Sequence, residues 1–290
     1  MEDSKSLRKT SSGSIAARGG VLYVGDLERA LLKVFPAEDA CSWDRTGLSV
    51  GDPRAQIEGV VVALDPTVAT MRSAVENGAN VLVTHHPLFL DPPDRFMPFD
   101  LEGQTSGAGV HFALTHGLCC MAFHTACDVS RKGLAVLPGL LRLKTIAPLD
   151  PLPHDPTKGF ACVCVPDGES LDLKHLAARC VSVFEMLPRV WGASSTRLER
   201  IAVCGGSASD SLQMCLSASI DCLVCGEVKY HDALNARESG LCIIELGHDV
   251  SERPLCALLA SEIIAAGVDE SCITILNQPD NWSTPESIRR

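Results

Sequence analysis

Three of the nine histidines stand directly after short apolar runs that are typical of β-strands. His85 follows residues 81–84, His124 follows 121–123 and His248 follows 244–247. The carboxyl ends of strands line the ligand crevice in open α/β sheets, so this placement gathers imidazoles at one rim. A single histidine at a strand end is more often a structural residue. Several of them in one chain indicate a functional site.

The pair His85-His86 is followed by Pro87. Adjacent strand residues point to opposite faces, so both imidazoles can serve one site only where the strand breaks into a turn. Pro87 favours an extended His86 and prevents a helix from starting there, which predicts such a turn. The two imidazoles can then hold one ion each, or both can hold the same ion.

A carboxylate lies four residues beyond each of the other two strand-end histidines. Asp128 follows His124, and Glu252 follows His248. Ser251 is expected to cap the helix that begins near Pro254. Imidazole and carboxylate ligands suit zinc, iron(II), manganese or cobalt, and a carboxylate can bridge two ions. The spacing therefore predicts a metal centre that needs no thiolate.

The elements that must position these residues alternate between strand-length and helix-length patterns, which is typical of an α/β fold. We predict strands at 60–64, 80–84, 118–123, 160–165, 200–204, 220–225, 241–246 and 272–276. We predict helices at 27–35 with Asp26 as N-cap, at 67–76 and at 254–266. The expected fold class is α/β, with two α/β lobes, mixed sheets and the metal site in the cleft between them.

Four prolines between 148 and 156 place a lobe boundary there, since proline removes backbone donors. We therefore predict a disordered tail at 1–20, an N-terminal lobe at 21–146, a Pro-rich connection at 147–158 and a C-terminal lobe at 159–290. The last lobe includes the predicted strand 272–276.

Bulk composition excludes several classes of protein. The apolar fraction of 46% and the charged fraction of 21% are those of a globular chain. A net charge of −11 argues against nucleic-acid binding, which needs a basic face. We find neither an apolar run long enough to span a bilayer nor a secretory signal, so we expect a soluble cytoplasmic protein without a membrane partner.

Fourteen cysteines are scattered through apolar segments, which predicts reduced, buried thiols. Cys222 and Cys225 form a CxxC inside a strand-like run, where residues three apart point to opposite faces. No second CxxC completes a zinc set, so we assign both thiols to core packing.

Six stretches, in this order, resemble the NGG-interacting factor three-like family, which is also known as GTP cyclohydrolase I type 2. They are SWDRTGLSVG at 42–51, ALDPT at 63–67, VTHHPLF at 83–89, HTACD at 124–128, CGE at 225–227 and GHDVSE at 247–252. The similarity runs from about Leu27 to Ala266. The roughly 60 residues between Leu141 and Arg200 leave little room for the inserted middle domain of longer members, so the chain resembles the short form.

The resemblance implies a two-lobed α/β fold, a centre of two divalent metal ions between the lobes, and a homo-oligomer, a ring-shaped hexamer. Carried over to this sequence, the metal ligands are His85, His86, Asp128, His248 and Glu252. His124 and Glu227 match positions suited to acid–base catalysis. Asp65 and His231 match positions that support the ligands. The alternative for these last four is a cap, core or exposed-helix role.

The sequence also departs from the family pattern. Arg45 and Thr46 replace the usual Asn-Val, Ala126 and Cys127 replace Asn-Leu, and Cys225 replaces a common Thr. None of these changes removes a proposed ligand. They affect the choice of substrate, because an Arg at the rim changes which anions fit.

Three functions are compatible with these observations. The first is a metal-dependent hydrolase that acts on a C–N bond of a nucleotide or related ring, with a small-molecule substrate. The sequence has no Gly-rich phosphate loop with a P-loop lysine, so the nucleotide rests on the resemblance alone. The second is a metal-handling or regulatory protein without turnover, and the third is an oligomeric interaction scaffold.

Overall fold

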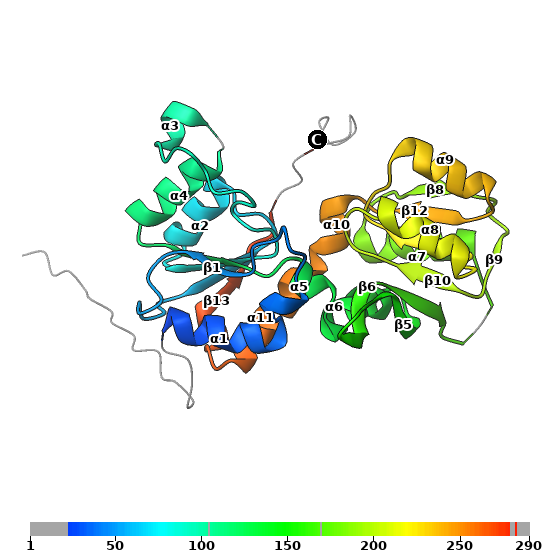
Figure 1. The fold of residues 1–290 in the computed structure, drawn as a ribbon, viewed down its shortest axis with the longest axis horizontal. Coiled ribbons are helices and arrows are strands. Elements are labelled where there is room, and N and C mark those ends of the chain that lie inside the picture. The colour runs from blue at the N-terminus through cyan, green and yellow to red at the C-terminus, as the bar shows by residue number, and fades with distance from the viewer. Residues whose placement is uncertain (1–22, 104, 169, 279–281, 283–290) are drawn as a thin grey trace, which may run out of the picture.

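The structure is a computed structural model that describes residues 23–103, 105–168, 170–278 and 282. The predicted tail at 1–20 lies outside these residues. The described chain forms two α/β lobes, seen at the left and right of Figure 1. The short helices α5 (Thr125–Asp128) and α10 (His248–Glu252) lie where the lobes meet. The predicted fold class, with two lobes and mixed sheets, is confirmed.

The first lobe is built on a mixed five-stranded sheet. Its strand order is β1 (Gly47–Val50), β4 (Cys119–Ala122), β3 (Val81–Thr84), β2 (Val60–Ala63) and β13 (Ile273–Ile275). The pairs from β4 to β13 are parallel and β1 pairs antiparallel with β4. The three central strands are buried along their whole length. Continuous apolar runs are expected where helices cover both faces of a sheet.

Helices cover both faces of this first sheet. Leu27 and Leu31 of α1 (Val24–Val34) and Leu259 of α11 (Pro254–Ala265) pack in one core with β2 and β3. On the opposite face, Met71 of α2 (Val68–Glu76) and Val110 of α4 (Ser106–Thr115) pack against Val61 and Leu82. The remaining short helices of this lobe are η1 (Ala37–Asp39), α3 (Phe99–Glu102) and η3 (Glu270–Cys272).

The second lobe has a mixed six-stranded sheet. The strand order is β5 (Leu143–Leu152), β6 (Asp155–Pro166), β10 (Ile201–Val203), β11 (Cys222–Cys225), β12 (Cys242–Glu245) and β8 (Arg189–Trp191). One face packs on α6 (Arg131–Leu140) and α7 (Leu173–Phe184), the other on α8 (Leu212–Ser217) and α9 (Tyr230–Glu238). The small sheet β7 (Leu171–Asp172) and β9 (Arg197–Leu198) and the helix η2 (Ser209–Ser211) complete the lobe.

The structure differs from the predicted division of the chain at two places. The predicted strand 272–276 is β13, but it pairs with β2 of the first sheet and not with the second lobe. The segment 147–158 is not a linker, because most of it lies in the β5–β6 hairpin. Pro148 and Pro151 are tolerated there because β5 is an edge strand, which leaves one side of its backbone without a ladder partner.

The cysteines agree with the expectation of free thiols. All fourteen are free, and all except Cys41, Cys204 and Cys272 are buried. Cys222 and Cys225 are fully buried in β11, which confirms their assignment to the core. Within the described residues, no helix is both long and apolar enough to cross a membrane.

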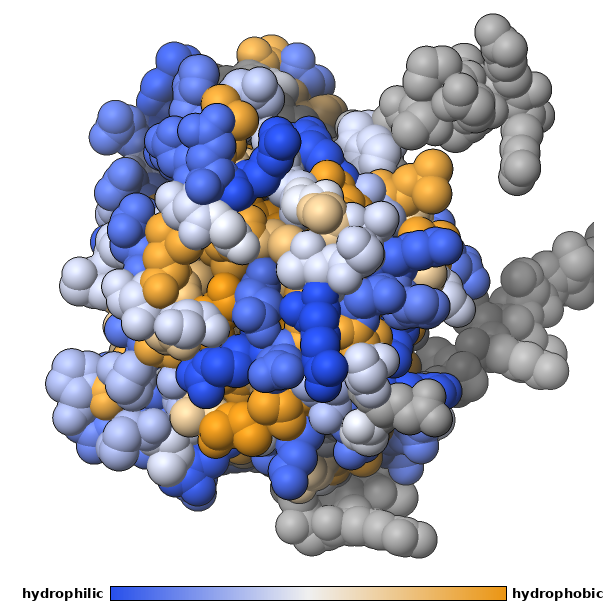
Figure 2. Space-filling model, turned by 90° about the vertical axis from the view of Figure 1, so that its right-hand side faces the viewer, coloured by the Kyte–Doolittle hydropathy of each residue, from blue (hydrophilic) through white to orange (hydrophobic). Residues whose placement is uncertain are grey.

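The surface of the second lobe is chemically mixed. Figure 2 shows the end of the molecule formed by this lobe, where apolar residues lie in patches among hydrophilic ones. Leu187, Val190 and Tyr230 are large apolar side chains of this lobe that are exposed. Exposed apolar patches of this kind often mark contact surfaces.

Candidate metal centre

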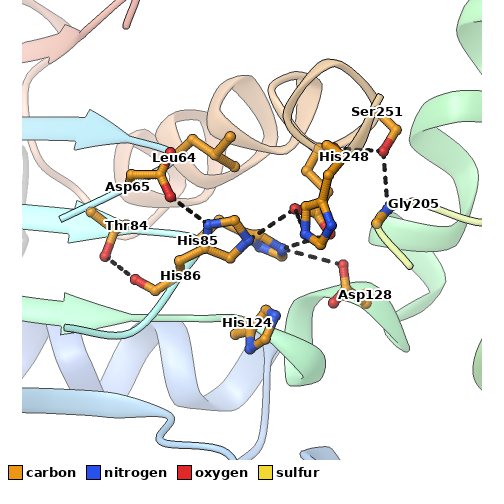
Figure 3. Close-up of polar contacts among 12 residues, drawn as sticks. Leu64, Asp65, Thr84, His85, His86, His124, Asp128, Gly205, His248 and Ser251 are labelled. Carbon is orange, nitrogen blue, oxygen red and sulfur yellow. Dashed lines mark hydrogen bonds and ion pairs between the residues drawn. The ribbon is translucent and has the colours of Figure 1, made fainter. Parts of the chain in front are cut away.

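The turn after β3 places His85 and His86 at the carboxyl edge of the first sheet. The backbone N–H groups of His85 and His86 donate to the carbonyls of Ala63 (3.2 Å) and Leu64 (3.0 Å), so pairing with β2 continues past the end of the strand. Thr84 Oγ1 donates to the carbonyl of His86 at 2.7 Å. These bonds fix the turn that lets two adjacent imidazoles face one site (Figure 3).

His85 is the most deeply buried member of the site. Its side chain is 0% exposed, and Nδ1 lies 3.2 Å from the carbonyl oxygen of Phe123. Because a carbonyl oxygen can only accept a hydrogen bond, Nδ1 carries the proton of the neutral imidazole. The lone pair of Nε2 then remains available to a ligand. Nε2 lies 3.6 Å from Asp128 Oδ1 and 3.8 Å from Glu252 Oε1, and it has no hydrogen-bond partner among the described residues. A buried nitrogen without a partner is costly, and a metal ion would satisfy it.

The other imidazoles of the site are anchored in the same way, each through Nδ1. His86 contacts Asp65 (2.7 Å), His124 contacts Asp44 (3.3 Å) and His248 contacts Glu227 (3.0 Å). Nε2 of His86 and of His248 lies 2.9 and 3.2 Å from Glu252 Oε2. Metal-binding histidines usually give one ring nitrogen to a carboxylate or carbonyl and the other to the ion. The arrangement therefore fits a metal centre.

Ligand atoms converge in two neighbouring groups. In one, ligand atoms of His85, His86 and His124 all lie within 4.8 Å of one another, and in the other the same holds for His86, His248 and Glu252. The two groups share His86. Asp128 lies at the edge of the first group, beside Nε2 of His85. The donor set of imidazoles and carboxylates suits a divalent transition metal.

Glu252 reaches the centre because a glycine gives it room. Gly206 has a φ of +59°, and a Cβ at this position would lie 2.3 Å from Glu252 Oε1. The Gly206 N–H donates to Ser251 Oγ at 2.9 Å, and this hydroxyl donates to the carbonyl of His248 at 2.8 Å. Ser251 thus ties α10 to the loop after β10 and does not cap α11 as predicted, since α11 begins with Pro254 directly behind α10.

We expect Gly206→Ala to weaken metal binding by about tenfold or more, because its Cβ displaces the Glu252 carboxylate and the backbone is strained at positive φ. Gly205→Ala is the matched control, since its Cβ would approach Glu252 no closer than 3.5 Å. Metal titration of both variants by calorimetry measures the difference. Equal affinity in the two variants would contradict this role of Gly206.

The charged groups of the site shift one another's pKa values. Burial lowers the pKa of His86, but hydrogen bonds to Asp65 and Glu252 outweigh it and raise the pKa to about 10. The hydrogen bond to Glu252 raises the pKa of His248 to about 9. Burial would raise the pKa of Glu252, yet the surrounding imidazoles hold it well below its usual range. Without metal, the carboxylate is therefore ionised and faces protonated imidazoles at neutral pH.

This charge state predicts a pH dependence of metal binding. A metal ion must displace the protons of His86 and His248, so affinity is low at acid pH and rises until these groups lose their protons near pH 9 to 10. Between pH 6 and 8 we expect an increase of about tenfold per pH unit for each displaced proton. Calorimetry in buffers of different ionisation enthalpy measures the protons released. A constant affinity over this range would contradict the prediction.

The structure brings together most of the residues predicted from the sequence. The five proposed ligands and His124 lie in one cluster. Asp65 is hydrogen-bonded to His86, and the exposed Glu227 is hydrogen-bonded to His248. His231 is exposed in α9, where its ring contacts Tyr230. Within the described part of the chain, no hydrogen bond or ion pair joins His231 to the cluster.

Asp44 was not singled out in the sequence. Its buried carboxylate accepts hydrogen bonds from the backbone N–H and the hydroxyl of Thr125 and contacts His124. Burial opposes ionisation, but these contacts lower the pKa of Asp44 to about 2. The stretch 42–51 that contains Asp44 carries part of the family resemblance, and this was the available signal.

A cavity of about 470 Å³ opens beside the cluster and is enclosed by both lobes. Its lining includes the proposed ligands Asp128, His248 and Glu252 as well as His124. The rest of the wall is largely apolar and comes mainly from α6, β6 and the segment that runs from the end of β10 to α8, with Trp43 from the first lobe. This combination of a few polar groups in an apolar cavity is typical of a small-molecule site.

Comparisons with known proteins agree with this architecture. A "GTP cyclohydrolase 1 type 2 homolog" of Streptomyces coelicolor is 32% identical over 244 residues, which cover 81% of this chain and 83% of that protein. A "GTP cyclohydrolase 1 type 2" of Helicobacter pylori is 26% identical and covers 81% of this chain and 88% of that protein. The crystal structure of a Bacillus cereus protein related to NIF3 superposes with a TM-score of 0.81, at 18% identity, over 91% of this chain and 99% of that chain.

The family itself follows from a match over most of the chain. The profile of the Duf34/NIF3 (NGG1p interacting factor 3) family matches residues 22–279, which include both lobes and every residue of the cluster. The chain therefore belongs to the Duf34/NIF3 family.

Proposed function

We propose that the protein binds two divalent metal ions, zinc, iron, manganese or cobalt, and hydrolyses a C–N bond of a nitrogen-containing ring. The ligands would be His85, His86, Asp128, His248 and Glu252. The observation that carries this proposal is the set of imidazoles, each anchored through Nδ1, around a buried carboxylate at the wall of a cavity. The names of the two GTP cyclohydrolase relatives support a ring hydrolase.

Bound divalent ions would supply Lewis acidity and activate water near neutral pH. Among the chain's own residues, His124 is suited to move a proton, because it lines the cavity and its orientation is fixed by Asp44. Glu227 acts as a positioning residue, since its carboxylate lies against Nδ1 of His248 and it does not line the cavity. The apolar wall would bind the ring and exclude water from it.

The proposal is tested with purified protein loaded separately with each of the four metals. Turnover of a panel of nucleosides, nucleotides, pterins and small cyclic amides is followed by absorbance and mass spectrometry. We expect ring opening or deamination of at least one compound with loaded protein and none with metal-free protein. Stoichiometric metal without any turnover would reject the hydrolase and support a metal-handling protein.

We further propose that the protein forms a homo-oligomer, a hexamer by resemblance to its family. The exposed apolar residues of the second lobe support a contact between copies. Light scattering at micromolar concentration should give a molar mass close to six times that of the 30.9 kDa chain. A mass that matches one chain would contradict the oligomer.

A further inference from the structure

The charge of the cavity wall bears on which ring the site accepts. The acidic residues of the lining are Asp128, Asp150, Asp210 and Glu252, and no lysine or arginine lies among the described lining residues. The carboxylates of Asp150 and Asp210 have no hydrogen-bond or ion-pair partner in the described part of the chain. The positive charge of two divalent ions would only balance the negative charge of these four carboxylates. The loaded cavity therefore offers no surplus of positive charge to an anion.

The basic residues next to the lining in the sequence are held by carboxylates. Lys132 pairs with Glu262 at 2.6 Å, Lys158 pairs with Asp39 at 2.5 Å and Arg253 pairs with Asp249. Arg45, the departure from the family pattern that was expected to change which anions fit, donates through Nε to the carbonyl of Leu90 and is not part of the lining. A phosphate chain would thus enter without a cationic partner from the protein.

The mouth of the cavity presents an aromatic face. Trp43 lines the cavity although it is 53% exposed, and its ring lies 5.7 Å from that of His124. An exposed tryptophan offers a stacking surface for a flat ring, and its face attracts electron-poor or cationic groups. The apolar residues Met214 and Phe160 also line this cavity.

We propose that the cavity selects a flat nitrogen heterocycle that carries no phosphate, such as a nucleobase, a nucleoside or a pterin. This inference rests on the proposed function and narrows its substrate. Ring N–H and exocyclic amino groups would donate to Asp150 and Asp210, because an ionised carboxylate accepts hydrogen bonds and donates none. Each terminal phosphate would bring about 1.5 to 2 negative charges toward the same carboxylates. The proposed substrate class, a ring without phosphate, thus differs from GTP, the nucleoside triphosphate in the names of the relatives.

Binding to the metal-loaded full chain tests this proposal independently of turnover. Calorimetry is performed with guanosine, pterin, GMP and GTP, and the metal content is measured again after each titration. We expect guanosine or pterin to bind and GTP to bind at least about tenfold more weakly than guanosine, because like charges face each other. Trp43→Ala should weaken binding of the rings about tenfold and leave the metal in place.

The acidic wall is tested with the double variant D150N/D210N. It should bind GTP about tenfold more tightly than the wild type does, with an unchanged metal content and melting temperature. The control E76Q/E238Q removes two exposed carboxylates outside the lining and should change nothing. Tighter binding of GTP than of guanosine by the wild type, or no binding of any phosphate-free ring, would overturn the proposal. Ring binding without turnover would reject the hydrolase alone.

Discussion

Glu252→Gln is expected to lower the metal content from two ions to less than one per chain and to weaken metal binding at least about a hundredfold. The carboxylate of Glu252 is 5% exposed and contacts Nε2 of His86 and of His248. Glutamine keeps the shape but removes the charge that holds these imidazoles together. The metal-free variant should also lose about 3 kcal/mol of unfolding free energy, because the partly buried imidazolium groups of His86 and His248 lose their counterion.

The control for Glu252→Gln is Glu262→Gln, which breaks an ion pair between the buried Glu262 and the exposed Lys132. It should lower the unfolding free energy but keep both ions. Elemental analysis and chemical denaturation of the two variants separate loss of metal from loss of stability. Full metal occupancy in Glu252→Gln would remove Glu252 from the ligand set.

The second large effect concerns turnover. His124→Asn should slow hydrolysis about a hundredfold or more while most of the metal remains, because His85, His86 and Asp128 still hold the first group. Glu227→Gln should also retain metal and slow hydrolysis less, since it acts through His248. Turnover and metal content are measured on the same preparations.

His175→Ala serves as the control for these variants, because the ion pair of this exposed imidazole within the described residues is with Asp172, the N-cap of α7, away from the site. His124 also lies within 4.8 Å of the ligand atoms of His85 and His86. If His124→Asn loses metal as completely as Glu252→Gln does, His124 is a ligand and not a proton carrier.

The strands that position the site were predictable because helices cover both faces of each sheet. Strands β2, β3 and β11 are therefore continuous apolar runs that stand out in the sequence. Hydrophobic periodicity does not say which sheet a strand joins. For this reason the predicted strand 272–276 is correct as a strand, but its assignment to the C-terminal lobe is wrong.

The ligand candidates were predictable because they follow strands or lie a fixed distance beyond a strand-end histidine. The groups that hold them were harder to predict, since they come from distant segments. Asp44 meets His124 across 80 residues, and Gly206 makes room for Glu252 across 46. Such contacts exist only after the distant segments have been brought together by folding. The sequence shows a glycine or an aspartate and gives no sign of its partner.

Anomalous X-ray diffraction from crystals of the zinc-loaded protein tests the central claim most directly. The account predicts two peaks per chain, each within about 2.0 to 2.2 Å of imidazole nitrogens or carboxylate oxygens from the set His85, His86, Asp128, His248 and Glu252. A single peak, no peak, or peaks bound by other residues would contradict a two-metal centre at this site.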